Sequence, residues 1–137
     1  MLRKIVCLFA VLPFVALLAA PAHAGKHDPL YTPDPIQVPA GKSGEDVKKA
    51  VKKAFFSKGW QTREIGPGHV QGKYAKTGKN DSYSAVVDVK FDNKGVRIGY
   101  KDSENLNYQK SDNTIHGTYN RWVKSLEREI RGNLGAY

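Results

Sequence analysis

Five side chains near the end of the sequence have the chemistry to recognise a ligand. They fall within residues 100–122, where amides, tyrosines and a histidine are denser than an exposed loop requires. This polar-aromatic patch consists of Asn105, Asn107, Tyr108, His116 and Asn120. Amides donate and accept hydrogen bonds, and a tyrosine carries a polar tip on an apolar body. The patch is expected between a strand end and a helix start, where a purely structural role in capping and turn formation is the alternative.

The same stretch holds the residue types of a hydrolase. Ser103 could act as nucleophile, Asp102 as orienting acid and His116 as base. Ser103 lacks the Gly-x-Ser-x-Gly elbow that would expose a nucleophile, so no residue is assigned as catalytic. A small envelope hydrolase using His116 with Ser103 or Asp102 is therefore an alternative to a binding function.

Metal and cofactor chemistry has little support in the sequence. His27, His69 and His116 are widely spaced, and no His-x-x-x-His or Glu-x-x-His pair occurs beyond residue 24. The glycines of residues 66–68 and 76–79 belong to turn sequences and do not match a phosphate-binding loop. We therefore expect no metal site and no cofactor.

A lysine-rich helix face is a second candidate surface. Residues 43–57 carry an apolar stripe at helical spacing, and the opposite face holds Lys48, Lys49, Lys52 and Lys53. Such a run is usually a solvated face. The functional alternative is contact with anionic lipid or lipopolysaccharide, which the formal charge of +9 at pH 7 favours.

The first 24 residues have the pattern of a cleaved signal peptide. Arg3 and Lys4 precede an apolar run, and Ala22 and Ala24 supply the small residues of a cleavage site. The run is shorter than the roughly 18–20 residues that span a bilayer, so no transmembrane anchor is expected after cleavage. We expect an exported, periplasmic protein whose partner is an envelope protein or an anionic envelope component. Nucleic acid is not expected, and the oligomeric state is open.

Residues 25–42 are predicted to form an extended tether. Pro29, Pro33, Pro35 and Pro39 occur in a segment with few apolar side chains, which favours an extended conformation. A single folded domain is then expected over residues 43–137.

The domain is predicted to be a two-layer α+β sandwich. Four short strands are expected at residues 60–65, 69–76, 83–91 and 96–101, because apolar side chains alternate there between turn sequences. A final helix over about residues 118–131 completes the order αββββα. Both helices are expected to cover one face of an antiparallel sheet.

Two segments carry a resemblance to a known family. Residues 100–108 read Tyr-Lys-Asp-Ser-Glu-Asn-Leu-Asn-Tyr, and residues 115–126 read Ile-His-Gly-Thr-Tyr-Asn-Arg-Trp-Val-Lys-Ser-Leu. Together with Lys58-Gly59-Trp60 they resemble a family of small, functionally uncharacterised exported proteins of Gram-negative bacteria, over roughly residues 47–130. The resemblance implies a periplasmic or lipoprotein-like compartment and a recurrent fold, but no reaction or ligand. Cys7 lies too early for a lipidation site, so this chain departs from the lipidated members. The expected function is a non-enzymatic, envelope-associated binding module.

Overall fold

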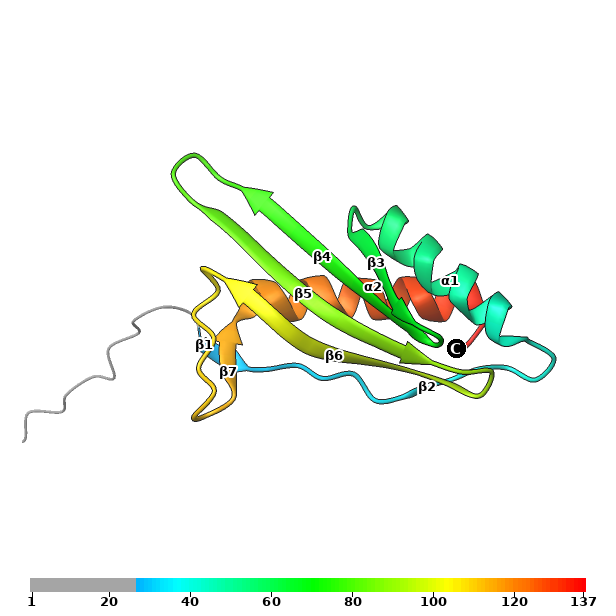
Figure 1. Ribbon diagram of the computed structural model, residues 1–137. Coiled ribbons are helices and arrows are strands. Elements are labelled where there is room, and N and C mark those ends of the chain that lie inside the picture. Colours follow the sequence, from blue (N-terminus) through cyan, green and yellow to red (C-terminus); the bar gives the residue numbers. More distant parts are fainter. Residues whose placement is uncertain (1–26) are drawn as a thin grey trace, which may run out of the picture.

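A computed structural model describes residues 27–137, and the expected signal peptide lies outside the described residues. This part of the chain forms two helices and seven strands (Figure 1). In chain order they are β1 (His27–Pro29), β2 (Ile36–Gln37), α1 (Gly44–Ser57), β3 (Gln61–Gly66), β4 (His69–Thr77), β5 (Ser82–Phe91), β6 (Gly95–Glu104), β7 (Thr114–His116) and α2 (Gly117–Leu134). Among residues 27–137, no helix has the length and apolar content needed to cross a membrane.

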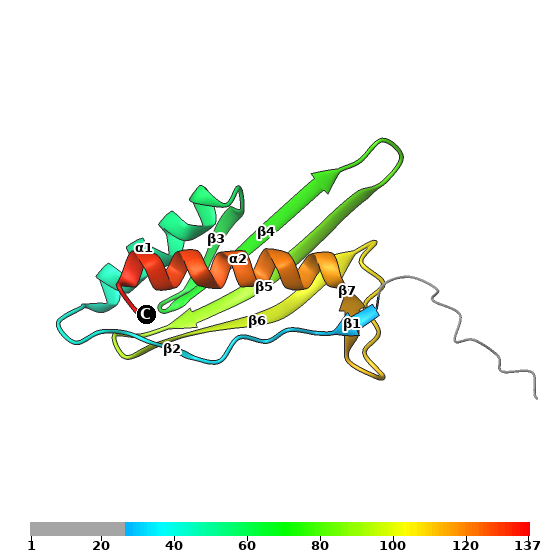
Figure 2. The same ribbon diagram turned by 180° about the vertical axis from the view of Figure 1, so that it is seen from behind.

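The main sheet is antiparallel and has helices on one face. Its strand order is β2-β6-β5-β4-β3, and β1 pairs with β7 in a separate two-stranded sheet. Strands lie in front of α2 in Figure 1, whereas the opposite view in Figure 2 places α2 in front of the strands. The predicted α+β class and the four strands β3 to β6 are thereby confirmed. We call the face turned away from the helices the open face.

The core lies between the helices and the inward face of the sheet. Apolar side chains at helical spacing on α1 and α2 meet alternating valines of the central strands. The residues at the centre of this layer are fully or almost fully buried: Val47, Val51, Phe55, Val70, Val87, Val89, Val123, Leu126 and Ile130. Burial of side chains of this size stabilises a fold by roughly 1.5–3 kcal/mol each before entropy is subtracted.

Helix α1 begins with a capping box. Ser43 accepts a hydrogen bond from the backbone N–H of Asp46, and the Asp46 carboxylate accepts one from the backbone N–H of Ser43. These reciprocal bonds satisfy two amide groups that the helix leaves without internal partners. Gly59 follows the helix with φ of 79°, a left-handed conformation that glycine adopts without strain.

The proline-rich segment is packed on the domain, which corrects the prediction of a tether. Ile36 is fully buried and pairs with Val96 of β6, and the N–H of Val38 donates to the carbonyl of Lys94 at 2.9 Å. A sheet edge tolerates nearby prolines because a strand there needs hydrogen bonds on one side only. One buried isoleucine and this edge pairing therefore hold a segment whose composition favours an extended arm. We call residues 27–38 the N-terminal strap.

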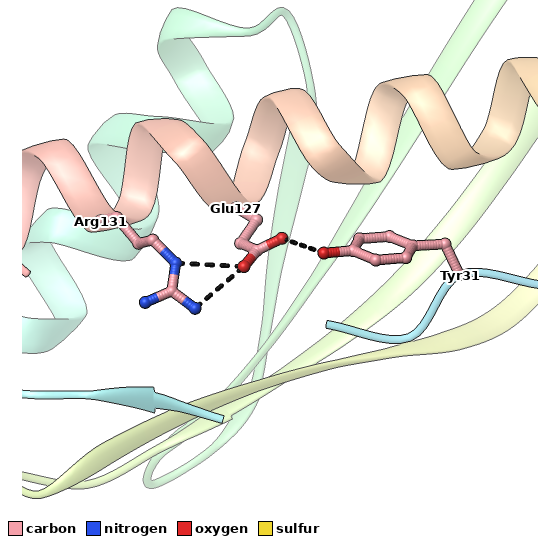
Figure 3. A network of polar contacts seen from close by, with 3 residues as sticks. All are labelled: Tyr31, Glu127 and Arg131. Atoms are coloured by element: carbon pink, nitrogen blue, oxygen red, sulfur yellow. Dashed lines mark hydrogen bonds and ion pairs between the residues drawn. The ribbon is translucent and has the colours of Figure 1, made fainter. Parts of the chain in front are cut away.

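A tyrosine attaches the strap to α2 (Figure 3). The hydroxyl of Tyr31 donates to Oε2 of Glu127 at 2.6 Å. The other carboxylate oxygen of Glu127 accepts from Nε and Nη2 of Arg131 at 3.0 and 2.9 Å. Lys124 places its Nζ 4.9 Å from the centre of the Tyr31 ring. The hydrogen bond to Glu127 and burial raise the pKa of Tyr31 from 10.0 to about 12.

Tyr31→Phe is expected to destabilise the protein at neutral pH by about 1 kcal/mol, because it removes one hydrogen bond to a charged group. The neutral phenol is the form favoured in the folded state, so this stabilisation is complete below pH 10 and disappears as the pH rises to about 12. Urea unfolding of both proteins from neutral pH to about pH 12 measures the difference in free energy. A difference that stays constant over this range would contradict the assignment.

Candidate functional site

Two asparagines of the polar-aromatic patch shape the backbone after β6. Asn105 and Asn107 have φ values of 58° and 52°, in the left-handed region that asparagine adopts more readily than most residues. The side-chain amide of Asn105 also donates to the carbonyl of Ser82 at 2.7 Å. Both residues thus have a structural reason to be present.

Tyr108 and His116 also make contacts within the fold. The Tyr108 ring stacks on Tyr100 with centroids 4.2 Å apart. His116 is the N-cap of α2, where its Nδ1 accepts a hydrogen bond from the N–H of Thr118 at 3.1 Å. This ring nitrogen replaces the side-chain oxygen that usually caps a helix.

Asn120 connects α2 to the N-terminal strap. Its Oδ1 accepts from the N–H of Tyr31 and its Nδ2 donates to the carbonyl of Pro29, both at 2.9 Å. The residue is only 9% exposed. Asn105, His116 and Asn120 therefore use side-chain polar atoms in hydrogen bonds within the protein.

The residues of the hydrolase alternative have separate surroundings. The Oγ of Ser103 shares a 2.8 Å hydrogen bond with the hydroxyl of Tyr100. Asp102 is the adjacent residue of β6, and successive strand residues point to opposite faces of a sheet. Within residues 27–137, no hydrogen bond joins His116 to Ser103 or Asp102. No group of three or more possible metal ligands occurs in the same part of the chain.

The lysine-rich face of α1 is divided by a carboxylate on β3. Lys48 and Lys52 lie 3.1 and 2.8 Å from the two carboxylate oxygens of Glu64. Hydrogen bonds lower the pKa of Glu64, and the bond from Lys52 has a larger effect than the bond from Lys48. Lys49 and Lys53 border a different shallow groove. Half of the predicted cationic face is therefore paired with an acid of the protein itself.

The open face of the sheet carries basic side chains that were not among the sequence-predicted site residues. Lys90 of β5 lies directly opposite Arg97 of β6 and directly opposite His69 of β4. Their neighbours Val89 and Ile98 are buried, so the three side chains share the open face. We call His69, Lys90 and Arg97 the basic row. In the described chain, neither Lys90 nor Arg97 forms an ion pair.

The position of Lys90 and Arg97 is unfavourable for stability alone. Like charges directly opposite each other on two strands destabilise the pair. Edge strands use charges to prevent aggregation, but β5 lies in the middle of the sheet. The like-charge pair therefore has no evident role in maintaining the fold.

A groove of about 580 Å³ adjoins the basic row. Its walls come from β2, the turn between β3 and β4, and the loop between β5 and β6, where Lys94 adds another cation. The turn is held against β5 at Gly68, where a Cβ would lie 2.4 Å from the carbonyl oxygen of Phe91. The carbonyl of Gly68 also accepts a 2.9 Å hydrogen bond from the N–H of Phe91. These contacts make the wall a fixed part of the fold.

The acids closest to the basic row are engaged by other groups. A 2.7 Å hydrogen bond joins Nε2 of His69 to Oδ1 of Asp88. Burial raises the pKa of Asp88, but hydrogen bonds from His69 and Gln71 outweigh burial and hold the pKa below its ordinary value. Oδ1 of Asp92, in the groove wall, accepts from the N–H groups of Lys94 and Gly95. Arg97 also helps to lower the pKa of Asp92, but in the described chain neither Lys90 nor Arg97 forms an ion pair with these acids.

The pairing of the strands is the signal that reveals the basic row. Phe91 opposes Val96 across the β5–β6 hairpin, which places Lys90 opposite Arg97. The pair could have been predicted from the sequence by pairing residues on either side of the short polar loop between β5 and β6, starting with Phe91 and Val96. The position of His69 depends in addition on the pairing of β4 with β5.

Comparisons with known proteins identify no family or relative, so the functional proposal is argued from the sequence and the structure. Models of known protein families give no match to this chain, and a search of curated proteins finds no relative.

Proposed function

We propose that the protein is a non-enzymatic binding module of the bacterial cell envelope that docks on phosphate-bearing lipid headgroups through the basic row. The observation that carries this proposal is the like-charge pair of Lys90 and Arg97, which is unpaired in the described chain and adjoins a groove. A partner with negative charge would relieve the repulsion between these side chains.

A lipid surface fits this region because apolar side chains are exposed at the turn between β3 and β4, which borders the groove. Ile65, at the end of β3, is 42% exposed, and Pro67 follows it in the turn that borders the groove. Peripheral membrane proteins combine apolar side chains with basic ones, and each lysine or arginine near an anionic surface contributes about 1 kcal/mol. Without Arg3 and Lys4 of the expected signal peptide, 20 basic and 13 acidic residues leave a formal charge of +7, which acts in the same direction.

The envelope location in this proposal follows from the sequence. A basic start, an apolar run and small residues around Ala24 have the pattern of an export signal. An exported basic protein meets anionic lipid headgroups rather than nucleic acid. Fractionation of cells that produce the untagged full-length chain tests the location, and recovery in the cytoplasmic fraction would contradict it.

Binding to vesicles of controlled composition tests the docking surface. Lys90→Gln/Arg97→Gln is expected to weaken binding to vesicles rich in phosphatidylglycerol by about 30-fold, because two contacts of about 1 kcal/mol each are lost. Vesicles of phosphatidylcholine alone should bind the protein weakly, and added salt should reduce binding to the anionic vesicles. Co-sedimentation or surface plasmon resonance measures the affinities.

Lys49→Gln/Lys53→Gln is the matched control because it removes the same formal charge from α1. It should retain most of the binding if the basic row is the contact surface. If both double variants lost the same amount of vesicle affinity, the protein would be attracted to the vesicles by its net charge alone, and the basic row would not be a specific contact surface. Full binding by Lys90→Gln/Arg97→Gln would refute the proposal. Thermal unfolding should show that this variant is at least as stable as the wild type, since a repulsive pair has been removed.

A further inference from the structure

On the open face of β6, the residues on both sides of Arg97 are glycines, which have no side chain. Residues two positions apart in a strand share a face, so Gly95 and Gly99 flank Arg97. A Cβ built at Gly99 would meet no atom within 4 Å, and this glycine does not have a positive φ. Neither a close contact of the Cβ nor a positive φ therefore requires glycine at position 99, although a register shift follows between Tyr100 and Asp102 of the same strand.

A glycine inside a strand carries a cost that Gly99 does not offset by any contact. It loses more conformational entropy on folding than other residues and contributes no cross-strand side-chain contact. Glycines inside strands often mark a bulge or a place where a ligand or another chain approaches the backbone, and we examine the second of these roles for Gly99. The open space over Gly99 lies beside Arg97, and Lys90 is directly opposite Arg97.

We infer that the surface over Gly99 is a seat for a single phosphate group, held by Arg97 and Lys90. This inference rests on the proposed function and specifies the chemical group that the docking surface recognises. The arginine guanidinium presents a planar fork of N–H donors that matches two phosphate oxygens, and lysine adds a compact positive charge. A side chain at position 99 would occupy the space that the phosphate needs.

The carboxylate of the residue opposite Gly99 is engaged by a residue of β4. Asp88 is the cross-strand partner of Gly99, so an unrestrained carboxylate here would repel a phosphate. His69 belongs to β4, on the far side of β5, and its Nε2 lies 2.7 Å from Oδ1 of Asp88. The carboxylate is thereby held toward β4, which leaves the β6 side to Arg97 and Lys90.

Gly99→Val tests the seat because its expected effects on stability and binding have opposite signs. Valine is favoured in strands and its Cβ would meet no atom within 4 Å, so the melting temperature should equal or exceed that of the wild type. The affinity for glycerol phosphate, measured by calorimetry or phosphorus NMR, should fall about tenfold or more, as expected when a charge-assisted hydrogen bond is lost. Arg97→Lys keeps the charge but loses the fork, and should also weaken binding. Ala75→Val adds bulk to an exposed position of β4 and should leave the affinity unchanged.

Parallel measurements with phosphatidylglycerol vesicles separate the seat from the docking function. Wild-type affinity for glycerol phosphate in Gly99→Val would overturn the seat, even if Lys90→Gln/Arg97→Gln still lost vesicle binding. Phosphate binding that depends on Gly99, without binding to vesicles, would support the seat and overturn the lipid-docking function. A clear fall in the stability of Gly99→Val would show that the glycine is structural and would also overturn the inference.

Discussion

Gly72→Ala is expected to lower the free energy of unfolding by about 1–3 kcal/mol, the usual cost of overpacking a core. Gly72 is buried in β4, and a Cβ at this position would lie 2.1 Å from Cε1 and 2.6 Å from Cδ1 of Phe55. The Phe55 ring is fully buried and packs against Trp60 with centroids 5.8 Å apart. The ring therefore has no free space into which it could move. Urea unfolding of the two proteins measures the loss.

A double variant shows whether this clash is the cause. Phe55→Leu removes ring atoms and should destabilise the protein by itself, because it leaves a cavity. In Phe55→Leu/Gly72→Ala the new methyl group would occupy part of that space. The double variant should therefore be more stable than the sum of the two single effects predicts, with a coupling of at least about 0.5 kcal/mol. Strictly additive effects would contradict the packing account.

Asn120→Ala is expected to cost about 2 kcal/mol or more, since it leaves the N–H of Tyr31 and the carbonyl of Pro29 without their partners. The N-terminal strap should then open locally more often than the rest of the domain. Hydrogen exchange at the Tyr31 amide should accelerate more than exchange in the core strands, and urea unfolding gives the total loss.

Asn120→Asp is the matched variant because it is close in size and retains an acceptor for the Tyr31 N–H. It cannot donate to the carbonyl of Pro29 when it is ionised. Its effect on Tyr31 exchange should be smaller than that of Asn120→Ala. If alanine left Tyr31 exchange unchanged, Asn120 would have no role in holding the strap.

The helices and central strands were predictable because their patterns are local. Helix α1 has its capping residue Ser43 and an unbroken apolar stripe, and burial alternates along β5 from Ala85 to Lys90. β2 was not predictable in this way because it contains only two residues and depends on one apolar side chain, Ile36, among prolines. Its structure depends on the pairing of Ile36 with the distant Val96, and the sequence near Ile36 does not indicate that pairing.

The candidate site shows the same division between local and distant information. His116 and Asn105 stood out as residue types, yet their side chains cap a helix and bond a neighbouring carbonyl. Residue type alone cannot separate such roles from ligand binding, because both use the same polar atoms. Lys90 and Arg97 were unremarkable one at a time, and their significance appears only when strand pairing places them together.

The N-terminal strap also has a consequence for the order in which the protein folds. β1 pairs with β7, and Tyr31 bonds to Glu127, which lies 96 positions later in the chain. Contacts between such distant residues form slowly because a long loop must close first. During synthesis the strap emerges early, but Asn120 and Glu127 emerge near the end. We therefore expect the strap to dock last, and until then the edge of β6 that it covers remains open to other chains. The edge of β6 is therefore covered only after α2 has formed and can hold the strap.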